Sequence, residues 1–371
     1  MYNFNKGKKM SRDWISSLKA VPLEWLLEFD NPPVRYFTMR DLLDYKKNDS
    51  DLIQTKESLS SYKTIQRIFS EQNYDGYWES DETPYLPKYK ASYWQLMLLG
   101  MFGLEKDDPH VELAFNHISK FQHLEGGFAE FMEGGARKEY DYLQNRRPKE
   151  KKQYPRFEEW GPARIREMQL SCLTGNVSLA LIRLGYYKNK VVKKALQWLL
   201  QVQNKDGGWL CPYWGTHKND THGCFMGTIT PLDAFSEIPE SQRSREIRNT
   251  IQHGAEFLLM HQLYKSDHHD FEVINKRWLK LCFPQFFYDI LRGLDVVTKL
   301  EYTSDDRIND ALGVVLSKQN ELGQWSMECS YTGRIHGTIE QKDKPSKWVT
   351  LNVLRVIKRI VQKRGDLFSV M

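Results

Sequence analysis

The sequence lacks the features that mark several common protein classes. None of its 371 residues falls in an apolar run of 18, about the length that a membrane-spanning helix needs. The first ten residues, from Met1 to Met10, are polar and contain no apolar core of a signal peptide. The net charge is only +5, from 53 Lys and Arg against 48 Asp and Glu that are evenly interleaved, which does not indicate nucleic-acid binding. We therefore expect a cytoplasmic protein without a transmembrane segment or a nucleic-acid partner.

Cysteine is scarce, whereas aromatic residues are abundant. Five cysteines, an odd number, in a chain without an evident signal peptide indicate reduced thiols or a metal site rather than a disulfide framework. The 11 Trp, 19 Tyr and 18 Phe exceed what helix packing alone usually requires. Two explanations remain open: the rings line a cavity, or they are used in repeated turns and in packing between helices.

One stretch, Trp198 to Trp209, recurs along the chain in altered form. It combines an apolar run that ends a helix with a glutamine, a Gly-Gly turn and a tryptophan. The glycines suit a left-handed or closely packed backbone after a helix, and the glutamine can bind free carbonyl groups. The glutamines of the five copies are Gln72, Gln122, Gln203, Gln262 and Gln319, and the copy at Gln262 lacks the Gly-x-Trp end. The spacing leaves room for two helices in each repeat.

This pattern, Gln followed by Gly-x-Trp after an aromatic and leucine-rich run, resembles the QW repeat of triterpene cyclases and their relatives among protein prenyltransferases. The resemblance covers roughly residues 54 to 363 and implies an all-α fold, the α/α toroid. Its implication for function is weaker, because toroids with similar Gly-Gly-Trp turns also occur among polysaccharide lyases, and one fold hosts many chemistries.

Hydrophobic periodicity predicts six helix pairs and therefore a toroid of six inner and six outer helices. We expect one domain over 1–371, a flexible start over 1–11, and a charged insertion over 129–167 that is either a lid or a solvated excursion. The predicted inner helices are 34–45, 89–102, 172–186, 223–235, 278–298 and 347–361. The predicted outer helices are 14–29, 52–70, 111–121, 191–203, 245–262 and 305–319.

In a toroid of this kind, the starts of the inner helices converge at one mouth, where the helix dipoles favour anions and thiolates. Cys172, Cys224 and Cys282 are predicted at such starts, and two more cysteines follow repeat turns. Our metal-ligand candidates are Cys172, Cys211, His222 and Cys224, a set that suits zinc. The spacing of Cys211, His217, His222 and Cys224 is not a standard zinc signature. For Cys282 and Cys329 we expect small thiols that fill gaps between helices.

The resemblance also suggests how the site differs from those of its relatives. Asp220, His222 and Cys224 are similar in type, though not in order, to the Asp, Cys and His that hold zinc in protein prenyltransferases. The Asp-x-Asp-Asp motif of protonation-initiated cyclases and the Asp-Asp-x-x-Asp motif of ionisation-initiated cyclases are both missing from the sequence. Protonation-initiated cyclisation is therefore disfavoured.

Acidic residues on inner helices are the other catalytic candidates, because burial raises the pKa of a carboxyl group and suits it to acid–base chemistry. They are Asp233, Asp289 and Asp295, and Asp220 joins them from the cysteine-rich connection. Asp289 has the most aromatic surroundings in the sequence. The alternative for these carboxylates, and the commoner one, is to cap a helix or to form an ion pair with one of the many Arg and Lys residues. The candidate substrate-binding residues are aromatics near predicted inner-helix starts, namely Tyr93, Trp94, Trp214, Trp278, Phe283 and Trp348, which either line the pocket or form core.

Three functional hypotheses follow. The first is an enzyme of the prenyltransferase or terpene-cyclase kind that acts on an isoprenoid or another hydrophobic small molecule, assisted by zinc. The second is a carbohydrate-active toroid similar to polysaccharide lyases, for which His268, His269, Asp270 and Arg277 offer suitable groups. The third is a binding protein that kept the toroid without catalysis.

Overall fold

The computed structural model describes residues 18, 20–150 and 154–365, and within them regular structure is helical apart from isolated β-bridges. This confirms the all-α class. The chain divides into two compact units, which are described separately. Unit 1 comprises residues 1–63, 259–332 and 339–371, and unit 2 comprises residues 64–258 and 333–338. The predicted flexible start over 1–11 lies outside the described residues. The prediction of a single domain stays a prediction.

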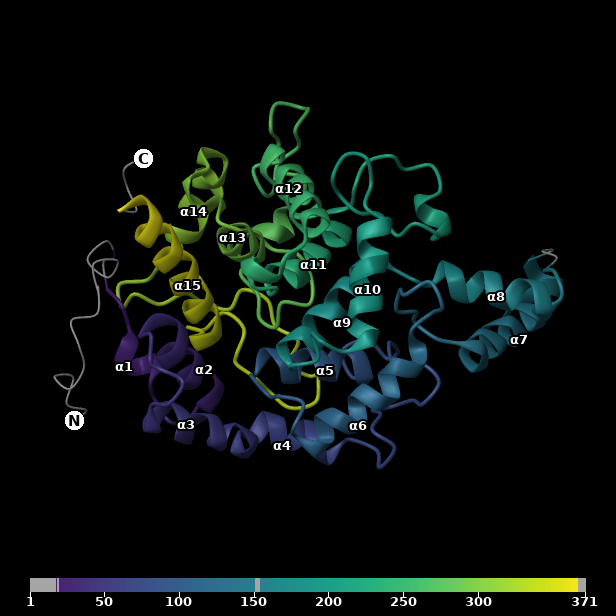
Figure 1. The fold of residues 1–371 in the computed structure, drawn as a ribbon, viewed down its shortest axis with the longest axis horizontal. Helices are drawn as coiled ribbons and strands as arrows, with labels where there is room; N and C mark the ends of the chain where they lie inside the picture. Colours follow the sequence, from purple (N-terminus) through teal and green to yellow (C-terminus); the bar gives the residue numbers. More distant parts are fainter. Residues whose placement is uncertain (1–17, 19, 151–153, 366–371) are drawn as a thin grey trace. The chain divides into compact units, whose positions relative to one another are not determined.

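Unit 2 alternates inner and outer helices along the chain (Figure 1). Three inner helices pack side by side in the order α5, α9, α11, and α6 and α10 pack on α5 and α9. The inner helices are α5 (Ser92–Met101), α9 (Ser171–Arg183) and α11 (Phe225–Ser236). The outer helices are α4 (Lys63–Ser70), α6 (Pro109–Ile118), α10 (Lys190–Gln201) and α12 (Arg245–Met260), the last of which ends just beyond the unit.

Burial follows this division as the sequence predicts. In α5 every residue from Ser92 to Gly100 is buried, as expected for an inner helix enclosed on all sides. In α10 the face with Val192, Leu196 and Leu199 is buried, whereas Lys193 and Lys194 are exposed. Inner and outer helices thus alternate in the manner that characterises α/α toroids.

The turns at Gln72, Gln122 and Gln203 share one pair of glutamine hydrogen bonds. In the turn after α10, the Gln203 side-chain amide donates to the carbonyl of Gly207 at 2.8 Å and to that of Thr250 in α12 at 2.9 Å. The Trp209 indole donates to the Leu199 carbonyl at 2.8 Å. Gln72 and Gln122 make the same pair of bonds to their own turn and to the next outer helix. Each glutamine therefore fastens one repeat to the next.

The glycine of each turn is required by its close approach to the following outer helix. Gly207 has φ +88°, and a Cβ there would lie 2.3 Å from the His253 carbonyl oxygen. The corresponding glycines Gly76 and Gly126 also have positive φ and meet a carbonyl of α6 or α10. A side chain is thus excluded by backbone conformation and by space at the same position.

A feature that we did not predict closes each turn. The backbone N–H of the turn's aromatic residue donates to a hydroxyl in the first turns of the next inner helix, as Trp209 does to Thr228 at 3.0 Å. Ser92, Thr174 and Thr350 accept the equivalent bonds from Trp78, Phe128 and Trp325. Because the number of residues between a turn and its hydroxyl varies from repeat to repeat, the repeat pattern alone does not predict these hydroxyls.

Unit 1 contains a second set of paired helices. The inner helices are α2 (Pro32–Phe37) with a π-helical turn at Thr38–Leu42, α13 (Ile290–Lys299) and α15 (Lys347–Arg364). The outer helices are α3 (Ser50–Glu57) and α14 (Asn309–Leu316), and a short α1 (Leu23–Leu26) lies near the start. Helix α15 packs on both α13 and α2. The turn at Gln319 repeats the pattern, since its amide donates to the Ala20 carbonyl at 3.1 Å.

Several predicted boundaries that involve unit 1 are wrong. Among the described residues of 14–29 only Leu23–Leu26 is α-helical, and the helix predicted over 52–70 is interrupted by a 3-10 turn at Ser58–Ser61. We expected an inner helix from Trp278, but α13 begins at Ile290, because Pro284 has no backbone N–H and Asp289 supplies an N-cap by accepting the Arg292 N–H at 2.8 Å. We also expected residues 30–33 to end a helix. Instead Asn31 caps α2, and Pro32 begins it, a position that favours proline.

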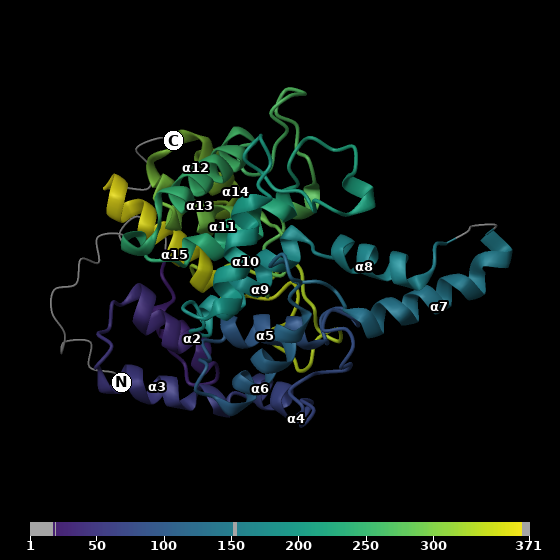
Figure 2. The same cartoon turned by 45° about the vertical axis from the view of Figure 1, so that its right-hand side comes forward.

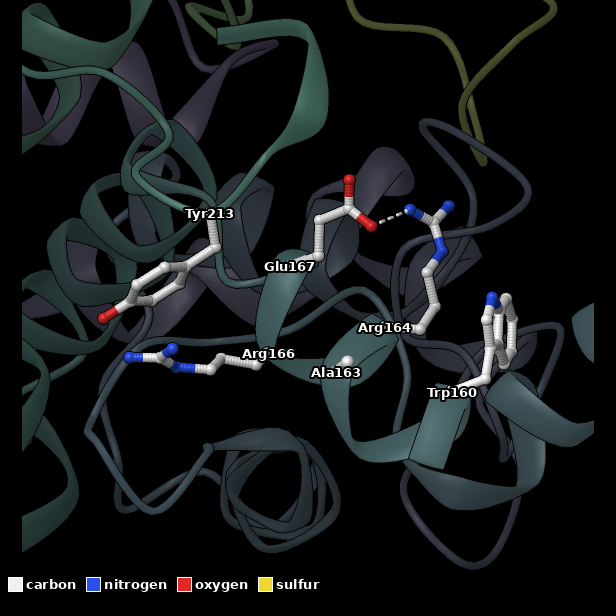
Figure 3. Close-up of a pocket in the computed structure, with 6 residues that line it drawn as sticks. All are labelled: Trp160, Ala163, Arg164, Arg166, Glu167 and Tyr213. Carbon is white, nitrogen blue, oxygen red and sulfur yellow. Dashed lines mark hydrogen bonds and ion pairs between the residues drawn. The ribbon is translucent and has the colours of Figure 1, made fainter. Parts of the chain in front are cut away.

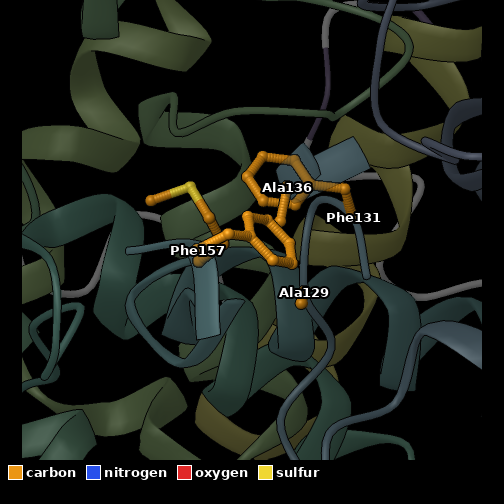
Figure 4. Packing of buried hydrophobic residues seen from close by; sticks show 5 residues of the cluster. Ala129, Phe131, Ala136 and Phe157 are labelled. Carbon is orange, nitrogen blue, oxygen red and sulfur yellow. The ribbon is translucent and has the colours of Figure 1, made fainter. Parts of the chain in front are cut away.

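The charged insertion over 129–167 forms a helical hairpin within unit 2. Helix α7 (Glu133–Glu150) and helix α8 (Phe157–Glu167) run side by side (Figure 2). A small apolar cluster joins their bases (Figure 4), formed by Ala129, Phe131, Ala136, Phe157 and Met168. Arg164 on α8 binds both carboxylate oxygens of Glu139 on α7, at 3.0 and 2.9 Å. The segment therefore has a core of its own, which its high charge concealed.

Across the described residues, none of the helices combines the length and the apolar character needed to cross a membrane.

Candidate functional site

The thiol of Cys211 belongs to unit 2 and lies at the N-terminus of α9. The segment 209–211 runs between two inner-helix starts: the Ser171 hydroxyl donates to the Leu210 carbonyl, and the Cys224 N–H donates to the Trp209 carbonyl at 2.9 Å. The Cys211 sulfur accepts hydrogen bonds from the Cys172 thiol, from the His217 side chain and from the backbone N–H groups of Ser171 and Cys172. The site thus combines three cysteines and a histidine.

These donors favour the ionised form of Cys211. The hydrogen bond from Cys172 and, against the effect of burial, those from His217 and the α9 N-terminus lower the pKa of Cys211 to about 5. The hydrogen bond between Cys172 and Cys211, together with burial, raises the pKa of Cys172. The hydrogen bond between His217 and Cys211 raises the pKa of His217. A thiolate beside a neutral thiol and an imidazole is the arrangement of a nucleophile or of a metal ligand.

We call Cys172, Cys211, Cys224 and His217 the thiol site. Cys224 stands at the N-cap position of α11, and burial raises its pKa. Three thiols and one imidazole are a donor set that zinc accepts. Within the described part of the chain, the three sulfurs do not form a group whose ligand atoms all lie within 4.8 Å of one another. The residue types of the set suit zinc, whereas the described positions of its three sulfurs do not gather into a metal-binding group.

Histidine 217, not His222, is the imidazole that contacts Cys211. His217 Nδ1 accepts the Cys211 backbone N–H at 3.3 Å. His222 is exposed, its Nδ1 lies 2.9 Å from the Gly223 carbonyl oxygen, and its ring lies 5.1 Å from that of Phe257. Both histidines occur in the connection that sequence analysis singled out, but only the fold distinguishes them.

Aromatic side chains lie near this site. The Trp94 indole N–H donates to the Tyr85 carbonyl at 2.7 Å, and the rings of Tyr85 and Tyr89 lie 5.3 and 5.1 Å from that of Trp94. Burial and the nearby Glu130, Cys172 and Cys211 raise the pKa of Tyr85 well above its usual value. Tyr93 is completely buried and donates to the Ala129 carbonyl at 3.0 Å. Of the predicted aromatics, Trp94 thus belongs to the ring cluster, and Tyr93 is core.

A carboxyl group that sequence analysis missed lies in the same region. Burial raises the pKa of Glu130 to about 7, against the opposite effects of Lys88 and Arg164. Cys211 is among the groups whose charge acts on it. Glu130 was overlooked because it follows a repeat turn rather than lying on an inner helix. The signal that identifies it is the apolar stretch Phe128, Ala129, Phe131 around it.

The other candidates in unit 2 lie away from the thiols or at the surface. Asp233 is buried and pairs with Arg183 at 3.4 Å near the C-terminal end of α11, the end opposite Cys224. Asp220 is exposed in the cysteine-rich connection, where its charge acts on His217 and Cys224. Trp214 is 38% exposed and lies 4.9 Å from the His217 ring.

The candidates in unit 1 form a separate cluster around the start of α13. Asp289 is buried, and burial raises its pKa to about 7, as the sequence predicted. Phe283 stacks on Trp348 with ring centroids 4.2 Å apart, and both are buried. The Trp278 ring lies edge-on to that of Tyr288 at 5.1 Å. These three aromatics therefore pack within unit 1.

For Asp295 the structure favours the ion-pair alternative, and for Cys282 and Cys329 the prediction is wrong. Burial alone would raise the pKa of Asp295, but Lys299 and Arg359 lower it to about 2, so this carboxylate is an ion-pair partner rather than an acid. Cys282 and Cys329 are not free thiols filling gaps: they form a disulfide with Cα atoms 5.0 Å apart. The sequence separation of 47 residues gave no indication of this pairing.

An open pocket of about 380 Å³ lies between α8 and the connection that carries the thiol site (Figure 3). It is lined by Trp160, Ala163, Arg164, Arg166, Glu167 and Tyr213. The Arg166 guanidinium lies 4.1 Å above the Tyr213 ring, and Glu167 accepts the Gly215 N–H at 2.9 Å. The charged groups of the pocket are therefore paired with neighbouring residues rather than left for a ligand.

No family model and no curated protein matches this chain. Among solved structures, a protein from Actinoplanes matches with 13% identity and a TM-score of 0.45, covering 90% of both chains. The type II terpene cyclase MstE from Scytonema matches with 16% identity and a TM-score of 0.41, covering 90% of this chain and 88% of that one. A variant of MstE in complex with geranylgeranyl dihydroxybenzoate matches with 15% identity and a TM-score of 0.42, covering 89% and 87%. Similarity at this level transfers neither a reaction nor a ligand to the present chain.

Proposed function

We propose that the protein is an enzyme of the prenyltransferase or terpene-cyclase kind, which transforms an isoprenoid or another hydrophobic small molecule at the thiol site of unit 2. The observation that carries this proposal is the contact of the buried Cys211 sulfur with Cys172, His217 and the N-terminus of α9, which lowers the pKa of this thiol close to aromatic rings. A buried thiolate needs several donors, and Cys211 has four. A structural cysteine in a helical core needs none of them.

The neighbouring groups suit the chemistry of a hydrophobic substrate. Rings such as those of Tyr85, Tyr89 and Trp94 present negative faces that stabilise carbocationic character. Glu130, with a pKa of about 7, holds a proton at near-neutral pH and can deliver it to or remove it from a substrate. Cys211, when ionised, provides a negative charge in the same region, opposite to that of a carbocation.

We further propose that Cys172, Cys211, Cys224 and His217 hold zinc. Zinc bound to these residues would lower the pKa of a coordinated thiol or water and so supply a nucleophile near neutral pH. In this proposal the α9 N-terminus keeps Cys211 ionised and ready as a ligand, and His217 replaces the His222 that the sequence suggested.

Metal analysis of the purified protein tests the zinc proposal. We expect one zinc per chain in the wild type, loss of zinc in Cys211→Ser and His217→Ala, and retention in the matched control His222→Ala. A metal-free wild type, or unchanged zinc in Cys211→Ser, contradicts the proposal. Circular dichroism of every variant separates loss of the ligand from loss of the fold.

The catalytic proposal is tested separately. Wild-type protein and Glu130→Gln are incubated with geranylgeraniol and geranylgeranyl diphosphate, and products are identified by mass spectrometry. We expect conversion by the wild type and a large loss in Glu130→Gln, with Asp233→Asn as the control that retains activity. If neither isoprenoid is converted, and neither changes the protein's tryptophan fluorescence, the proposed substrate class is wrong.

A further inference from the structure

The disulfide of unit 1 joins two segments that are already aligned by other bonds. Cys282 precedes α13, and Cys329 follows the turn at Gln319, so the bond connects positions 47 residues apart. Next to it, the Glu328 N–H donates to the Leu281 carbonyl at 2.9 Å, and the Leu281 N–H donates to Glu328 Oε2 at 2.8 Å. The Glu328 carboxylate is held in turn by Lys318 at 2.6 Å. These bonds do not depend on the sulfur–sulfur bond.

The segment that carries Cys282 is also anchored on its other side. The Cys282 N–H donates to Asp289 Oδ2 at 3.2 Å, while Asp289 Oδ1 caps α13 by accepting the Arg292 N–H. Phe283, the next residue, is buried against Trp348 of α15. The backbone on both sides of Cys282 is therefore fixed by contacts that would survive cleavage of the disulfide.

The cysteines themselves are accessible. Both Cys282 and Cys329 are only partly buried, and the neighbouring Lys280 is exposed. A cross-link over 47 residues stabilises a fold mainly by constraining the unfolded chain, so it is not needed to hold its two segments together once they are folded. Here the partners stay adjacent without the bond, and both cysteines are partly exposed to a reductant. Such a disulfide can be reduced and formed again without large movement of the chain.

From this arrangement we infer that Cys282 and Cys329 form a reversible dithiol–disulfide site, and that its partner is a protein dithiol of the thioredoxin type. A thiolate of the partner attacks one sulfur of the disulfide, forming a mixed disulfide and releasing the other cysteine as a thiolate, which takes a proton. The second thiol of the partner then attacks the mixed disulfide. Two electrons pass to the chain, which gains two thiols, and the partner leaves as a disulfide.

This inference is independent of the proposed function, because the two cysteines belong to unit 1 and the thiol site to unit 2. In unit 2 the described cysteines Cys172, Cys211 and Cys224 are all free. The chain thus contains both a disulfide and thiols, and a mild reductant should change only the former.

Peptide mass spectrometry after alkylation tests the inference on the full-length chain. We expect that oxidised glutathione joins the peptides of Cys282 and Cys329, that reduced thioredoxin separates them, and that a second oxidation rejoins them. Far-ultraviolet circular dichroism should remain unchanged throughout. In Cys329→Ser, the remaining Cys282 should instead accumulate a glutathione mixed disulfide, whereas the control Cys211→Ser should retain the reversible cross-link.

Two results would overturn the inference. The first is a wild-type chain in which oxidised glutathione leaves Cys282 and Cys329 as thiols or as mixed disulfides, because the pair would then not be aligned. The second is loss of helical signal on reduction, because the disulfide would then be a structural support of unit 1.

Discussion

Substitution of Gly207 by alanine probes the feature on which the repeated turns depend, the contact between a glycine and the next outer helix. Gly207 has φ +88°, and a Cβ placed there lies 2.3 Å from the carbonyl oxygen of His253 and 2.8 Å from its carbonyl carbon. Ordinary contacts of a Cβ with such atoms begin near 3.4 Å. The turn and α12 must therefore separate by about 1 Å, estimated from these distances, unless the turn changes its conformation.

The expected cost has two parts. Placing alanine in the left-handed region costs about 1–2 kcal/mol. Overpacking against backbone, which cannot rotate away, costs about 1–3 kcal/mol more. Separation of the turn from α12 also stretches the bond from Gln203 to Thr250, whose net value is about 1 kcal/mol. We therefore expect Gly207→Ala to lower the free energy of unfolding by about 3–6 kcal/mol, the sum of these terms.

Gly185 provides a matched control in the same unit. Its φ of +90° is almost the same as that of Gly207, but the atoms nearest to a Cβ at this position belong to the flexible Lys106 side chain, at 3.7 Å. Gly185→Ala should therefore cost only the conformational part, about 1–2 kcal/mol. The difference between the two variants isolates the contact with α12.

Urea denaturation followed by circular dichroism measures both variants against the wild type. The expected order of stability is wild type, then Gly185→Ala, then Gly207→Ala, with a gap of about 2–4 kcal/mol between the two variants. Equal losses in both would mean that the positive φ accounts for the whole cost. The reasoning about close approach between turn and outer helix would then be refuted.

Three further predictions concern ionisable groups. Because hydrogen bonds lower the pKa of Cys211 to about 5 from the 9.0 of an ordinary thiol, its ionisation stabilises metal-free protein at pH 7. This advantage over Cys211→Ser should shrink as the pH falls from about 9 to about 5, measured by urea denaturation across that range. The depressed pKa of Asp295, about 2 against 3.8, contributes about 2 kcal/mol above pH 4. In thermal scans, the loss caused by Asp295→Asn should therefore fade towards pH 2, and a loss that stays constant would contradict the ion-pair assignment. The pKa of Asp289 is raised rather than lowered, so ionisation of this carboxyl destabilises the folded chain as the pH rises. Asp289→Asn should therefore gain stability relative to wild type between about pH 4 and about pH 7. A relative decline over that range would show that the carboxylate is stabilised as an anion.

The helical framework was largely predictable because its signals are local. Apolar periodicity placed all six inner helices, and the glycine and glutamine of each turn identified where one repeat passes to the next. The errors arose where a local signal for a helix start or a helix break was misinterpreted. Asn31 with Pro32 was interpreted as an end although it begins α2, and Pro284 was passed over although it prevents a helix from Trp278. In both cases the information was present in the sequence.

The candidate site was predictable only in its broad location. Cys172 and Cys224 do stand at the starts of α9 and α11, because repeat turns deliver the chain there. Which histidine meets Cys211 was not predictable, since His217 and His222 differ by five positions in a connection without regular spacing. Glu130 was missed because its environment depends on Lys88, Arg164 and Cys211, which lie far from it in the sequence.

Local sequence is sufficient for the all-α class, the alternation of buried and amphipathic helices, and the turns in which glycine is indispensable. These follow from interactions between residues a few positions apart, which the chain makes wherever it folds. Packing in the folded chain lowers the pKa of Cys211 and of Asp295, raises that of Asp289, and bonds Cys282 to Cys329. Charge, protonation and cross-linking depend on which groups packing brings within a few ångströms, and segments 39 and 47 residues apart meet only in the folded chain.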